Sequence, residues 1–473
     1  MSFWFFILGG IYIGALAFAT LGARKDNKSE EDFALAGSDL GVVLGCLTVA
    51  ATLYSTFTLM GMPDFFRTHG VGAWIFIAVS DAIFAFVILW FGFYLRQKAQ
   101  RHSFRGIAGL MSDCYKSKWA GYIYLVGVFI FLIPYVAIQL RGIAIFLNAA
   151  FPEFLPVWGW ASLMVMVMLI YSELGGLKAI IYADAIQGVI LLTVTLIIAF
   201  GCIQYFGGIG EMFAEVEKSN DALLSVPGPK GLFTTQFLLA SLIAIIMVPV
   251  TQPQVTVRIA IMRDLGAMKR MAAMLGVFAI ILLLAVIPIG MYGAVRYPDM
   301  SVANFLAQVL IHDQTPLVAA AIAVGLIAAA ISTSDSQIFA FGNEFRSVLK
   351  ADNDKSVQYM RYVIVVFALT ALAVAIQATD QLVLLARVSF AGTSLLAPLV
   401  ITGVMKETPP PKIIFFATVA GLGFFLLSLV GYAPSSIFGL RTDLALFIAI
   451  GLSAILASVL ADRTANKKTA TAA

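Results

Sequence analysis

Four polar side chains stand within five residues of one apolar segment, and their types suit a small cation. Ser332, Thr333, Asp335 and Ser336 lie inside the apolar stretch from about 317 to 345. In a helix Ser332, Asp335 and Ser336 share one face, because they are spaced i, i+3 and i+4. Hydroxyl and carboxylate oxygens are hard ligands, which favour an alkali cation over a transition metal. Hydrogen bonding of the hydroxyls to the helix backbone is the alternative, but it leaves Asp335 unexplained.

The composition places this segment in a membrane. Hydrophobic residues make up 61% of the 473 residues and charged residues only 12%, and the mean hydropathy is +0.96. A soluble domain of this length could not bury so much apolar surface, so the sequence predicts a multi-pass protein of the cell membrane with the lipid bilayer around it. The net charge of +4 is too small to indicate a nucleic-acid partner.

Thirteen apolar segments are long enough to cross about 30 Å of hydrocarbon as helices. They are residues 3–22, 40–65, 71–95, 119–150, 157–175, 179–207, 233–258, 271–295, 315–347, 357–378, 380–403, 411–431 and 441–462. With the N-terminus outside the cell, nearly every Lys- and Arg-rich loop falls on the cytoplasmic side, as the positive-inside rule requires. The sequence therefore predicts an N-terminus outside and a C-terminus inside.

Two of these segments contain residues that interrupt a helix. The second has a polar cluster at 54–58 closed by Gly61 and Pro63, and the seventh contains Pro249 and Pro253. A proline removes one backbone donor and frees a carbonyl to face a cavity. Interrupted helices at the start of two five-helix units are typical of transporters built from inverted repeats, with the binding site at the membrane midplane. Two ordinary proline kinks are the alternative.

On this pattern the chain divides into four parts. They are an extra N-terminal helix and cytoplasmic loop (1–39), a first five-helix repeat (40–208), a second, inverted five-helix repeat (233–403), and two C-terminal helices with a short tail (411–473). Ionisable residues inside the apolar spans each cost roughly 2.5–3.5 kcal/mol near a helix centre, so several should pair or face a hydrated pathway. They are Asp81, Arg141, Glu173, Asp184, Asp335 and Arg387.

Further stretches match motifs of one transporter family. Residues 171–179 fit a glycine-pair motif, and Asp184 with Gln187 fits the Asp-x-x-Gln that follows it. The stretch 253–258 fits a motif running from proline to arginine, and 329–337 is similar to a sodium motif of the ninth helix. The chain thus resembles the sodium:solute symporters, which carry sugars, proline, sialic acid, pantothenate and monocarboxylates. The resemblance implies an all-α, LeuT-like inverted-repeat fold with about thirteen transmembrane helices and alternating access.

This resemblance also implies Na⁺ as the coupling ion, with no organic cofactor. The family's main sodium ion lies between the second and ninth helices. Carried over to this chain, its ligands are the backbone carbonyls of Ala51, Tyr54 and Ala329 and the hydroxyls of Ser332 and Thr333.

A second sodium site, present in some relatives, implies a further set of ligands here. They are Asp184, Ser332, Asp335 and Ser336. A proton-coupled carrier on the same fold stays open, because Asp184 and Asp335 could titrate instead of holding sodium.

The family's solute pocket also maps onto this chain. The residues are Tyr54, Ser55, Thr56, Thr58, Asp81, Gln139, Arg141, Gln252 and Gln254. In sialic-acid transporters an arginine of the fourth helix holds the substrate carboxylate, and the resemblance implies Arg141 as its counterpart. A bidentate guanidinium–carboxylate pair is a strong recognition device in a low dielectric. The alternative is that Arg141 pairs with a carboxylate of another helix, such as Asp81.

The sequence therefore predicts a secondary transporter that moves a small organic solute, with a carboxylate favoured, together with Na⁺. A membrane solute-sensing subunit is the alternative from another class, because some relatives carry this unit fused to a signalling kinase. An enzyme is not expected, since the three histidines lie in no nucleophile–base arrangement. The oligomeric state stays open, and a monomer is compatible with the sequence.

Overall fold

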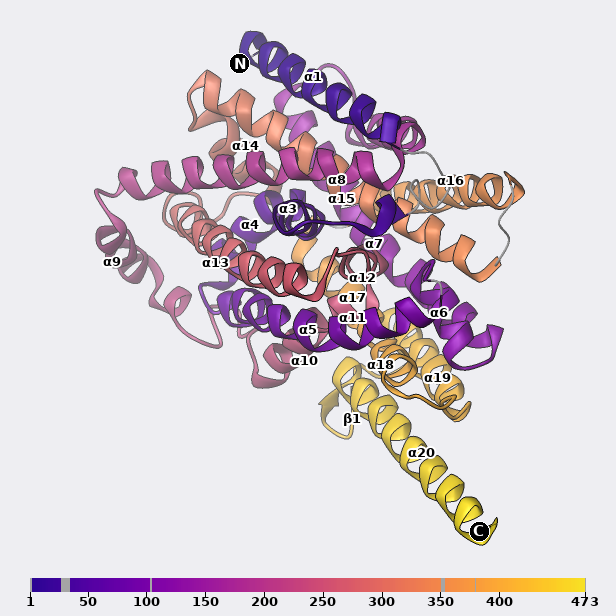
Figure 1. The fold of residues 1–473 in the computed structure, drawn as a ribbon. Coiled ribbons are helices and arrows are strands. Elements are labelled where there is room, and N and C mark those ends of the chain that lie inside the picture. The colour runs from indigo at the N-terminus through magenta and orange to yellow at the C-terminus, as the bar shows by residue number, and fades with distance from the viewer. Residues whose placement is uncertain (1, 27–34, 103, 350–353, 379, 473) are drawn as a thin grey trace.

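The computed structural model describes residues 2–26, 35–102, 104–349, 354–378 and 380–472. The fold is built almost entirely from helices (Figure 1), because in lipid the backbone must satisfy its own hydrogen bonds. The longer helices in chain order are α1 (Ser2–Asp26), α3 (Val42–Leu53), α4 (Met62–His69), α5 (Ala73–Arg101), α6 (Ile107–Cys114), α7 (Lys118–Ala150), α8 (Val157–Tyr205), α9 (Ile209–Asn220), α10 (Thr235–Ile246), α11 (Val248–Thr251), α12 (Pro253–Ala260), α13 (Leu265–Arg296), α14 (Val302–Ala307), α15 (Pro316–Leu349), α16 (Asp354–Gln377), α17 (Leu382–Ser394), α18 (Ala397–Met405), α19 (Ile413–Leu429) and α20 (Thr442–Ala472).

Short elements complete the chain. They are the 3₁₀ turns η1 (Ala36–Ser38) and η3 (Asp221–Leu224), the π-helical turns η2 (Phe57–Gly61) and η4 (Gln308–His312), and the antiparallel strands β1 (Ser436–Ile437) and β2 (Leu440–Arg441). The two strands form a small hairpin immediately before α20.

Eight helices in the described part of the chain are long and apolar enough to cross a membrane, or up to ten if each of two bent pairs is one span. All thirteen apolar segments predicted from the sequence fall on helices. The segments 157–175 and 179–207 are joined in α8, whose course is broken at Gly176, a residue with a positive φ of 63°. The side chain of Glu173 lies outside the described residues. The number of spans and the sidedness of the termini stay predictions.

Both predicted helix interruptions are present. α3 ends at Leu53, Tyr54 is extended (φ −93°, ψ 112°), and the continuation through η2 and α4 is bent by 46°. In the seventh segment Gln252 is extended (φ −98°, ψ 118°) between α11 and α12, and Pro253 begins α12. Proline suits that first helical position, where its missing N–H has no partner to lose. The predicted repeats 40–208 and 233–403 therefore each begin with a broken helix.

The centre of the molecule is formed by α7 and α15. Of the spanning helices these two are the most buried within the protein, at 72% and 78% of their apolar windows, whereas α1 and α20 are buried to only 6% and 17%. α15 packs against α3, α7 and α8, which brings the ninth predicted segment against the broken helix. α1 lies along one edge, and α20 extends away from the body at the other end (Figure 1).

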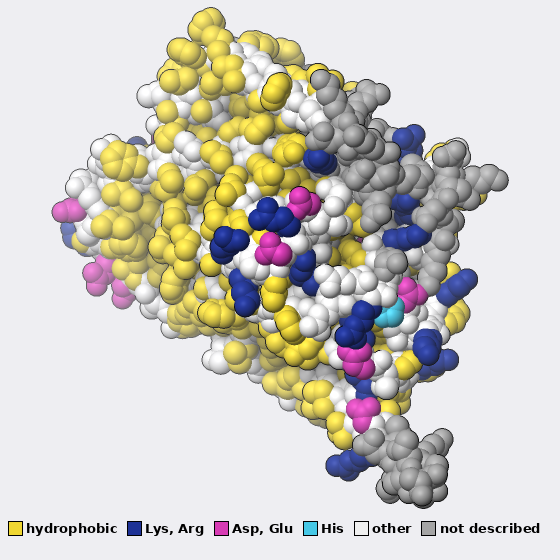
Figure 2. Space-filling model, in the orientation of Figure 1, with side chains coloured by type: hydrophobic (Ala, Val, Ile, Leu, Met, Phe, Trp, Pro, Cys, Tyr) yellow, Lys and Arg dark blue, Asp and Glu magenta, His cyan; other side chains and the backbone are white. Residues whose placement is uncertain are grey.

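The surface is that of a protein surrounded by lipid. Figure 2 shows hydrophobic side chains over most of one face, with lysines and arginines gathered toward one side. Large apolar side chains such as Phe6, Phe18 and Phe416 are exposed on α1 and α19. Apolar patches of this extent need a membrane or a partner to cover them.

Candidate sodium site and solute cavity

The break after α3 leaves a backbone carbonyl available to the hydroxyls of α15. In a continuous helix the N–H of Ser55 would donate to the carbonyl of Ala51, but here it donates to Thr58 Oγ1 at 3.2 Å. The carbonyl oxygen of Ala51 instead lies 3.2 Å from Ser332 Oγ and 3.0 Å from Thr333 Oγ1. The residues that end α3 thereby place a carbonyl against α15.

These oxygens are a suitable ligand set for Na⁺. All three are buried and hard, and a hydroxyl oxygen keeps lone pairs for a cation after its hydrogen turns away. Tyr54 stands in the break itself, and Ala329 precedes Thr333 by one helical turn on α15. Within the described residues no three His, Cys, Asp or Glu side chains gather as a transition-metal site would require. The hard oxygens that meet between α3 and α15 favour an alkali ion.

Ser332 also belongs to a second polar cluster, centred on Asp184 of α8. Asp184 Oδ1 accepts a hydrogen bond of 2.7 Å from Ser332, and Oδ2 accepts from Thr48 at 2.5 Å. Arg258 of α12 donates Nη2 to Oδ2 at 2.9 Å, and Ser336 Oγ lies 3.3 Å from the same oxygen. Ser332 has one hydrogen, which can point to Asp184 or to Ala51 but not to both at once. This hydroxyl joins the two clusters.

Arg258 and Thr48 are members of this cluster that the sequence did not assign to the site, and Arg258 makes the most contacts. It donates Nε to Thr48 at 2.8 Å, Nη1 to the carbonyl of Gln254 at 2.6 Å, and Nη2 also to Ser336 at 2.7 Å. The guanidinium therefore compensates the charge of Asp184 without an added ion. The available signal was an arginine at the end of an apolar helix, but its partner lies 74 residues away in the sequence.

Asp335 stands apart from this cluster. It is buried, and in the described part of the chain neither of its carboxyl oxygens has a hydrogen-bond partner. Of the four residues predicted for a second sodium site, the structure brings Asp184, Ser332 and Ser336 together and leaves Asp335 outside their hydrogen bonds. An isolated buried carboxylate is costly, so this group requires a proton or a cation.

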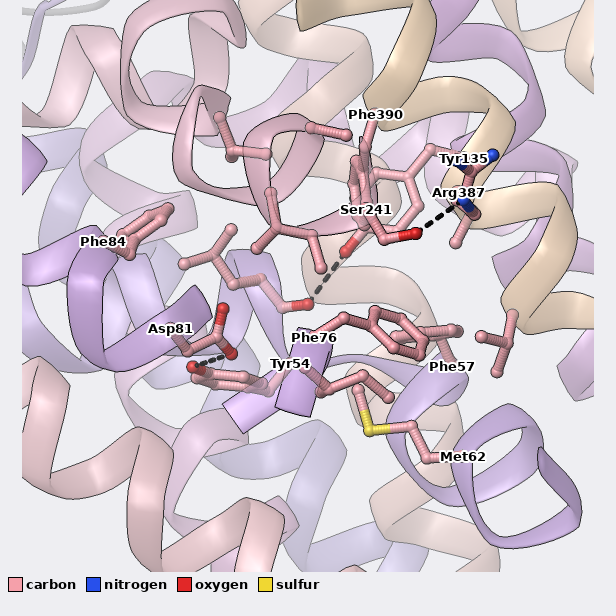
Figure 3. A pocket seen from close by; sticks show the side chains of 17 residues that line it. Tyr54, Phe57, Met62, Phe76, Asp81, Phe84, Tyr135, Ser241, Arg387 and Phe390 are labelled. Carbon is pink, nitrogen blue, oxygen red and sulfur yellow. Dashed lines mark hydrogen bonds between the residues drawn. The ribbon is translucent and has the colours of Figure 1, made fainter. Parts of the chain in front are cut away.

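A cavity lies beside the broken helix, between α3, η2, α5, α7, α10 and α17 (Figure 3). Its walls are mostly apolar and aromatic, and the aromatic residues are Tyr54, Phe57, Phe76, Phe84, Tyr135 and Phe390. Its polar residues are Tyr54, Asp81, Tyr135, Ser241 and Arg387. The cavity has about 50 Å³ of space open to the centre of a water molecule, which is room for only a few waters. A larger solute therefore enters after side chains or helices move.

The break in α3 also shapes this cavity. Tyr54 donates its hydroxyl to Asp81 Oδ2 at 2.8 Å, so the residue next to the sodium ligands reaches the acidic end of the cavity. Tyr135 of α7 donates to the carbonyl of Leu53 at 2.8 Å, which satisfies another acceptor left by the helix end. The cavity wall and the candidate sodium site therefore share the segment 51–54.

The other residues predicted for the solute pocket are not among those that line this cavity. Ser55 and Thr58 bond each other within the turn, and Thr56 Oγ1 is buried without a described partner. Gln139 donates to the carbonyl of Tyr135 on its own helix at 3.2 Å. Gln254 Nε2 donates to Gln252 Oε1 at 2.6 Å, within the second helix break.

Arg141 has a carboxylate partner outside the cavity. Its Nε and Nη2 lie 3.1 and 3.0 Å from Oδ1 of Asp380, in the segment before α17. Asp380 lines a separate cavity together with Asp64, Arg67 and His69. The arginine that lines the cavity beside Tyr54 is Arg387, which the sequence marked only as an ionisable residue in an apolar span.

Comparisons with known proteins identify the family. Residues 33–408 match the Sodium:solute symporter family. The sodium/pantothenate symporter of Haemophilus influenzae is 24% identical over 453 residues, which are 90% of this chain and 92% of that protein. An uncharacterised symporter of Bacillus subtilis, YodF, is 27% identical over 50% of this chain and 47% of its own length.

Solved structures show the same fold. A Na⁺-coupled sialic acid symporter in a substrate-bound, outward-open state has a TM-score of 0.76 at 16% identity, covering 95% of this chain and 96% of that one. MhsT in complex with L-phenylalanine has a TM-score of 0.57 at 14% identity, covering 89% and 98%. The LeuT-like fold predicted from the sequence is confirmed. The chain belongs to the sodium:solute symporter family, and it is a multi-pass membrane transporter rather than an enzyme.

Proposed function

We propose that this protein couples the entry of Na⁺ to the uptake of a small organic carboxylate by alternating access. The observation that carries the proposal is the meeting of the Ser332 and Thr333 hydroxyls with the Ala51 carbonyl, where α3 breaks. An ion held there would bridge α3 and α15, and would therefore favour the arrangement in which these helices touch. The carbonyls of Tyr54 and Ala329 are proposed to complete the ligand set.

The segment 51–54 provides the coupling. Ala51 contributes a sodium ligand, and Tyr54 is bonded to Asp81 in the wall of the solute cavity. Sodium bound at Ala51 would hold the end of α3 in place and so pre-form one wall of the cavity. A solute in the cavity would stabilise the sodium site by the same free energy, because coupling between two sites is reciprocal.

A carboxylate is the proposed solute for two reasons. The Haemophilus relative is a sodium/pantothenate symporter, and pantothenate is a small organic acid. This chain also keeps two arginines inside apolar spans, Arg141 and Arg387, and a guanidinium binds a carboxylate strongly where water is scarce. Each Na⁺ that enters down a potential of 100 mV supplies about 2.3 kcal/mol, which offsets the cost of moving one carboxylate charge inward against the same potential. Accumulation of the acid is then driven by the Na⁺ concentration gradient, or by the potential if a second Na⁺ enters.

Asp335 supports a second candidate function, a carrier on the same fold that is driven by protons. Its two buried oxygens have no hydrogen-bond partner in the described chain, whereas Asp184 already has Arg258. A proton on Asp335 would remove the cost of its charge, and so would a second Na⁺ ligated with Ser332 and Ser336. The two alternatives differ in which ion drives uptake.

The test is uptake of labelled pantothenate by proteoliposomes, together with thermal unfolding of the purified protein without solute. In the sodium symporter, replacing Na⁺ with choline abolishes uptake at pH 6 and at pH 8, and Na⁺ alone raises the unfolding temperature by mass action. Uptake that persists in choline at the lower pH supports the proton carrier instead. Unfolding temperatures that are equal in Na⁺ and choline would overturn the sodium proposal, even if pantothenate is not the solute.

A further inference from the structure

We propose that Arg387 binds the carboxylate of the transported solute, and that Asp443, at the start of the last helix, holds it in position. The inference rests on the proposed symport of a carboxylate and names the residue that recognises it. It also gives α20, which lies outside the two predicted repeats, a part in substrate recognition.

The guanidinium of Arg387 is held rigidly at the cavity wall. Nε donates to Ser241 Oγ of α10 at 2.7 Å, and Nη2 donates to Asp443 Oδ2. The group also lies over the ring of Phe237, 4.8 Å from its centroid. None of the hydrogen bonds in the described chain uses Nη1. A fixed planar group with one free edge is pre-organised to bind an anion, because little side-chain entropy remains to be lost.

The charge of this cluster also favours an anion. Asp443 Oδ1 lies 3.4 Å from Nε of Arg441, so two guanidinium groups share one carboxylate. The cluster of Arg387, Arg441 and Asp443 therefore keeps one net positive charge at the edge of an apolar cavity. A solute carboxylate would neutralise it in a region where water screens poorly.

The opposite end of the cavity defines the rest of the solute. Figure 3 shows Asp81 and Arg387 on opposite sides of the lining, with Tyr54 beside Asp81. Aromatic and aliphatic side chains lie between them. The complementary solute has a carboxylate at one end, an apolar body, and a hydroxyl or amide donor at the other end, facing Asp81.

Arg141, the arginine implied by the family resemblance, is placed differently. Its Nε and Nη2 both contact one oxygen of Asp380. This pair has one positive and one negative charge, so its net charge is zero. It is also absent from the residues that line the cavity beside Tyr54. These two facts make Arg387 the better candidate for recognition.

The experiment compares acids with neutral analogues of the same shape. The probes are pantothenate with panthenol, and hydroxyphenylpropanoate with its amide, each tested by thermal stabilisation of the purified full-length protein in Na⁺. In the parent at least one acid should bind more tightly than its neutral partner. Arg387→Gln should reduce the affinity for that acid about tenfold or more, the loss of one charge-assisted hydrogen bond, while the neutral analogue binds as before. Arg387→Lys should recover only part of the preference, because it lacks the planar fork.

Arg67→Gln is the matched control. Arg67 is similarly buried, pairs with Asp64 at 2.6 Å, and lies 4.6 Å from the ring centroid of Phe305, but it does not line this cavity. The variant should unfold at a lower temperature and keep the parental ratio of acid to neutral affinity. For Asp443 the test of positioning is a double-variant cycle: Asp443→Ala should change that ratio in the parent and leave it unchanged in Arg387→Gln.

Three results would overturn the inference. They are a parent in which no acid binds better than its analogue, an Arg387→Gln variant with the parental ratio, and loss of the ratio in Arg141→Gln alone. The last would support Arg141 instead. Stabilisation by Na⁺ without solute separates the two proposals: if Na⁺ stabilises the parent and Arg387→Gln equally while the acid arm fails, the sodium proposal stands and this inference falls.

Discussion

Two buried arginine–aspartate pairs, Arg258–Asp184 and Arg387–Asp443, differ in how many of their guanidinium nitrogens already donate hydrogen bonds to the protein. The side chains of the first pair are each 1% exposed, and those of the second are 10% and 7% exposed. Every nitrogen of the first guanidinium donates to the protein, whereas Nη1 of the second makes none of the described hydrogen bonds. A saturated pair fastens helices together, and an unsaturated pair at a cavity wall can still bind a ligand.

The largest expected effect is on the saturated pair. Arg258→Met leaves the carboxylate of Asp184 buried without a cation, which should cost about 3–5 kcal/mol of unfolding free energy. Arg387→Met should cost less, because Asp443 keeps its contact with Arg441. Unfolding of both variants in detergent measures the difference.

A second change checks that charge is the cause. Adding Asp184→Leu to Arg258→Met removes the uncompensated carboxylate and should restore part of the lost stability. Equal losses for Arg258→Met and Arg387→Met would show that the two pairs are energetically alike, and the distinction between a saturated and an unsaturated pair would fail.

The next effect concerns the two hydroxyls of the candidate sodium site, of which Ser332 also bonds the Asp184 cluster. Ser332→Ala and Thr333→Ala should each weaken sodium binding about tenfold to a hundredfold, because each removes a proposed ligand. Without Na⁺, Ser332→Ala should lower thermal stability more than Thr333→Ala, because Ser332 bonds Asp184 as well as the Ala51 carbonyl, whereas Thr333 bonds only the carbonyl. The measurement is the Na⁺ concentration that gives half of the full thermal stabilisation.

Ser334→Ala is the control for these two variants. Its hydroxyl is buried on the same helix without a described partner, so its removal should leave sodium binding unchanged. Sodium dependence that is the same in all three variants would show that the contact at Ala51 is a structural hydrogen bond.

The fold and the meeting of Ala51 with Ser332 and Thr333 were predictable from the sequence, for one physical reason. Backbone exposed to lipid must satisfy its own hydrogen bonds in long helices, so helix-length apolar segments and the polar residues that interrupt them both stand out in the sequence. Such features can be recognised in this sequence: they are the helix-length apolar segments, the prolines around Gln252, and the hydroxyls at 332–333. Family resemblance supplied Ala51, whose carbonyl acts through backbone geometry and not through residue type.

The solute cavity was less accessible, because its walls have the composition of lipid-facing helices. Whether Phe76 or Phe390 faces a cavity or a lipid depends on the rotation of its helix within the bundle. The partners of the arginines are also set by tertiary structure: Arg387 meets an aspartate 56 residues later, and Arg141 one 239 residues later. An arginine in an apolar span indicates that a partner exists, but the sequence does not identify that partner.

Asp335 extends the comparison to a carboxylate without an arginine. If it ligates a second Na⁺, sodium-dependent uptake should show a Hill coefficient above one in the parent, and Asp335→Ala should lower it toward one. Asp335→Asn keeps the shape of the side chain and removes the charge, so it should have the same effect. A parental coefficient of one, together with no net charge moved per carboxylate taken up, would exclude the second ion.

The smallest effect is expected at an arginine–aspartate pair whose side chains are exposed. Arg263 and Asp264 precede α13 with side chains that are 56% and 51% exposed, and Asp264 caps the helix by accepting a 2.7 Å hydrogen bond from the N–H of Ala267. That backbone hydrogen bond, with the nearby guanidinium of Arg263, holds the pKa of the Asp264 carboxyl below its usual value.

Because the pKa of Asp264 is lower in the folded state, its stabilisation is present above the pKa of the unfolded chain and is lost as pH falls through the folded value. The unfolding temperature of the parent should therefore exceed that of Asp264→Ala slightly near neutral pH, and the gap should close below about pH 4. Ser301 caps α14 by accepting a hydrogen bond from the N–H of Asn304, and its hydroxyl does not titrate. The difference in unfolding temperature between the parent and Ser301→Ala should therefore not change with pH. If the difference in unfolding temperature between the parent and Asp264→Ala is constant across this range, the cap acts through its shape alone. The charges of the exposed pair would then contribute nothing to stability, unlike those of the two buried pairs.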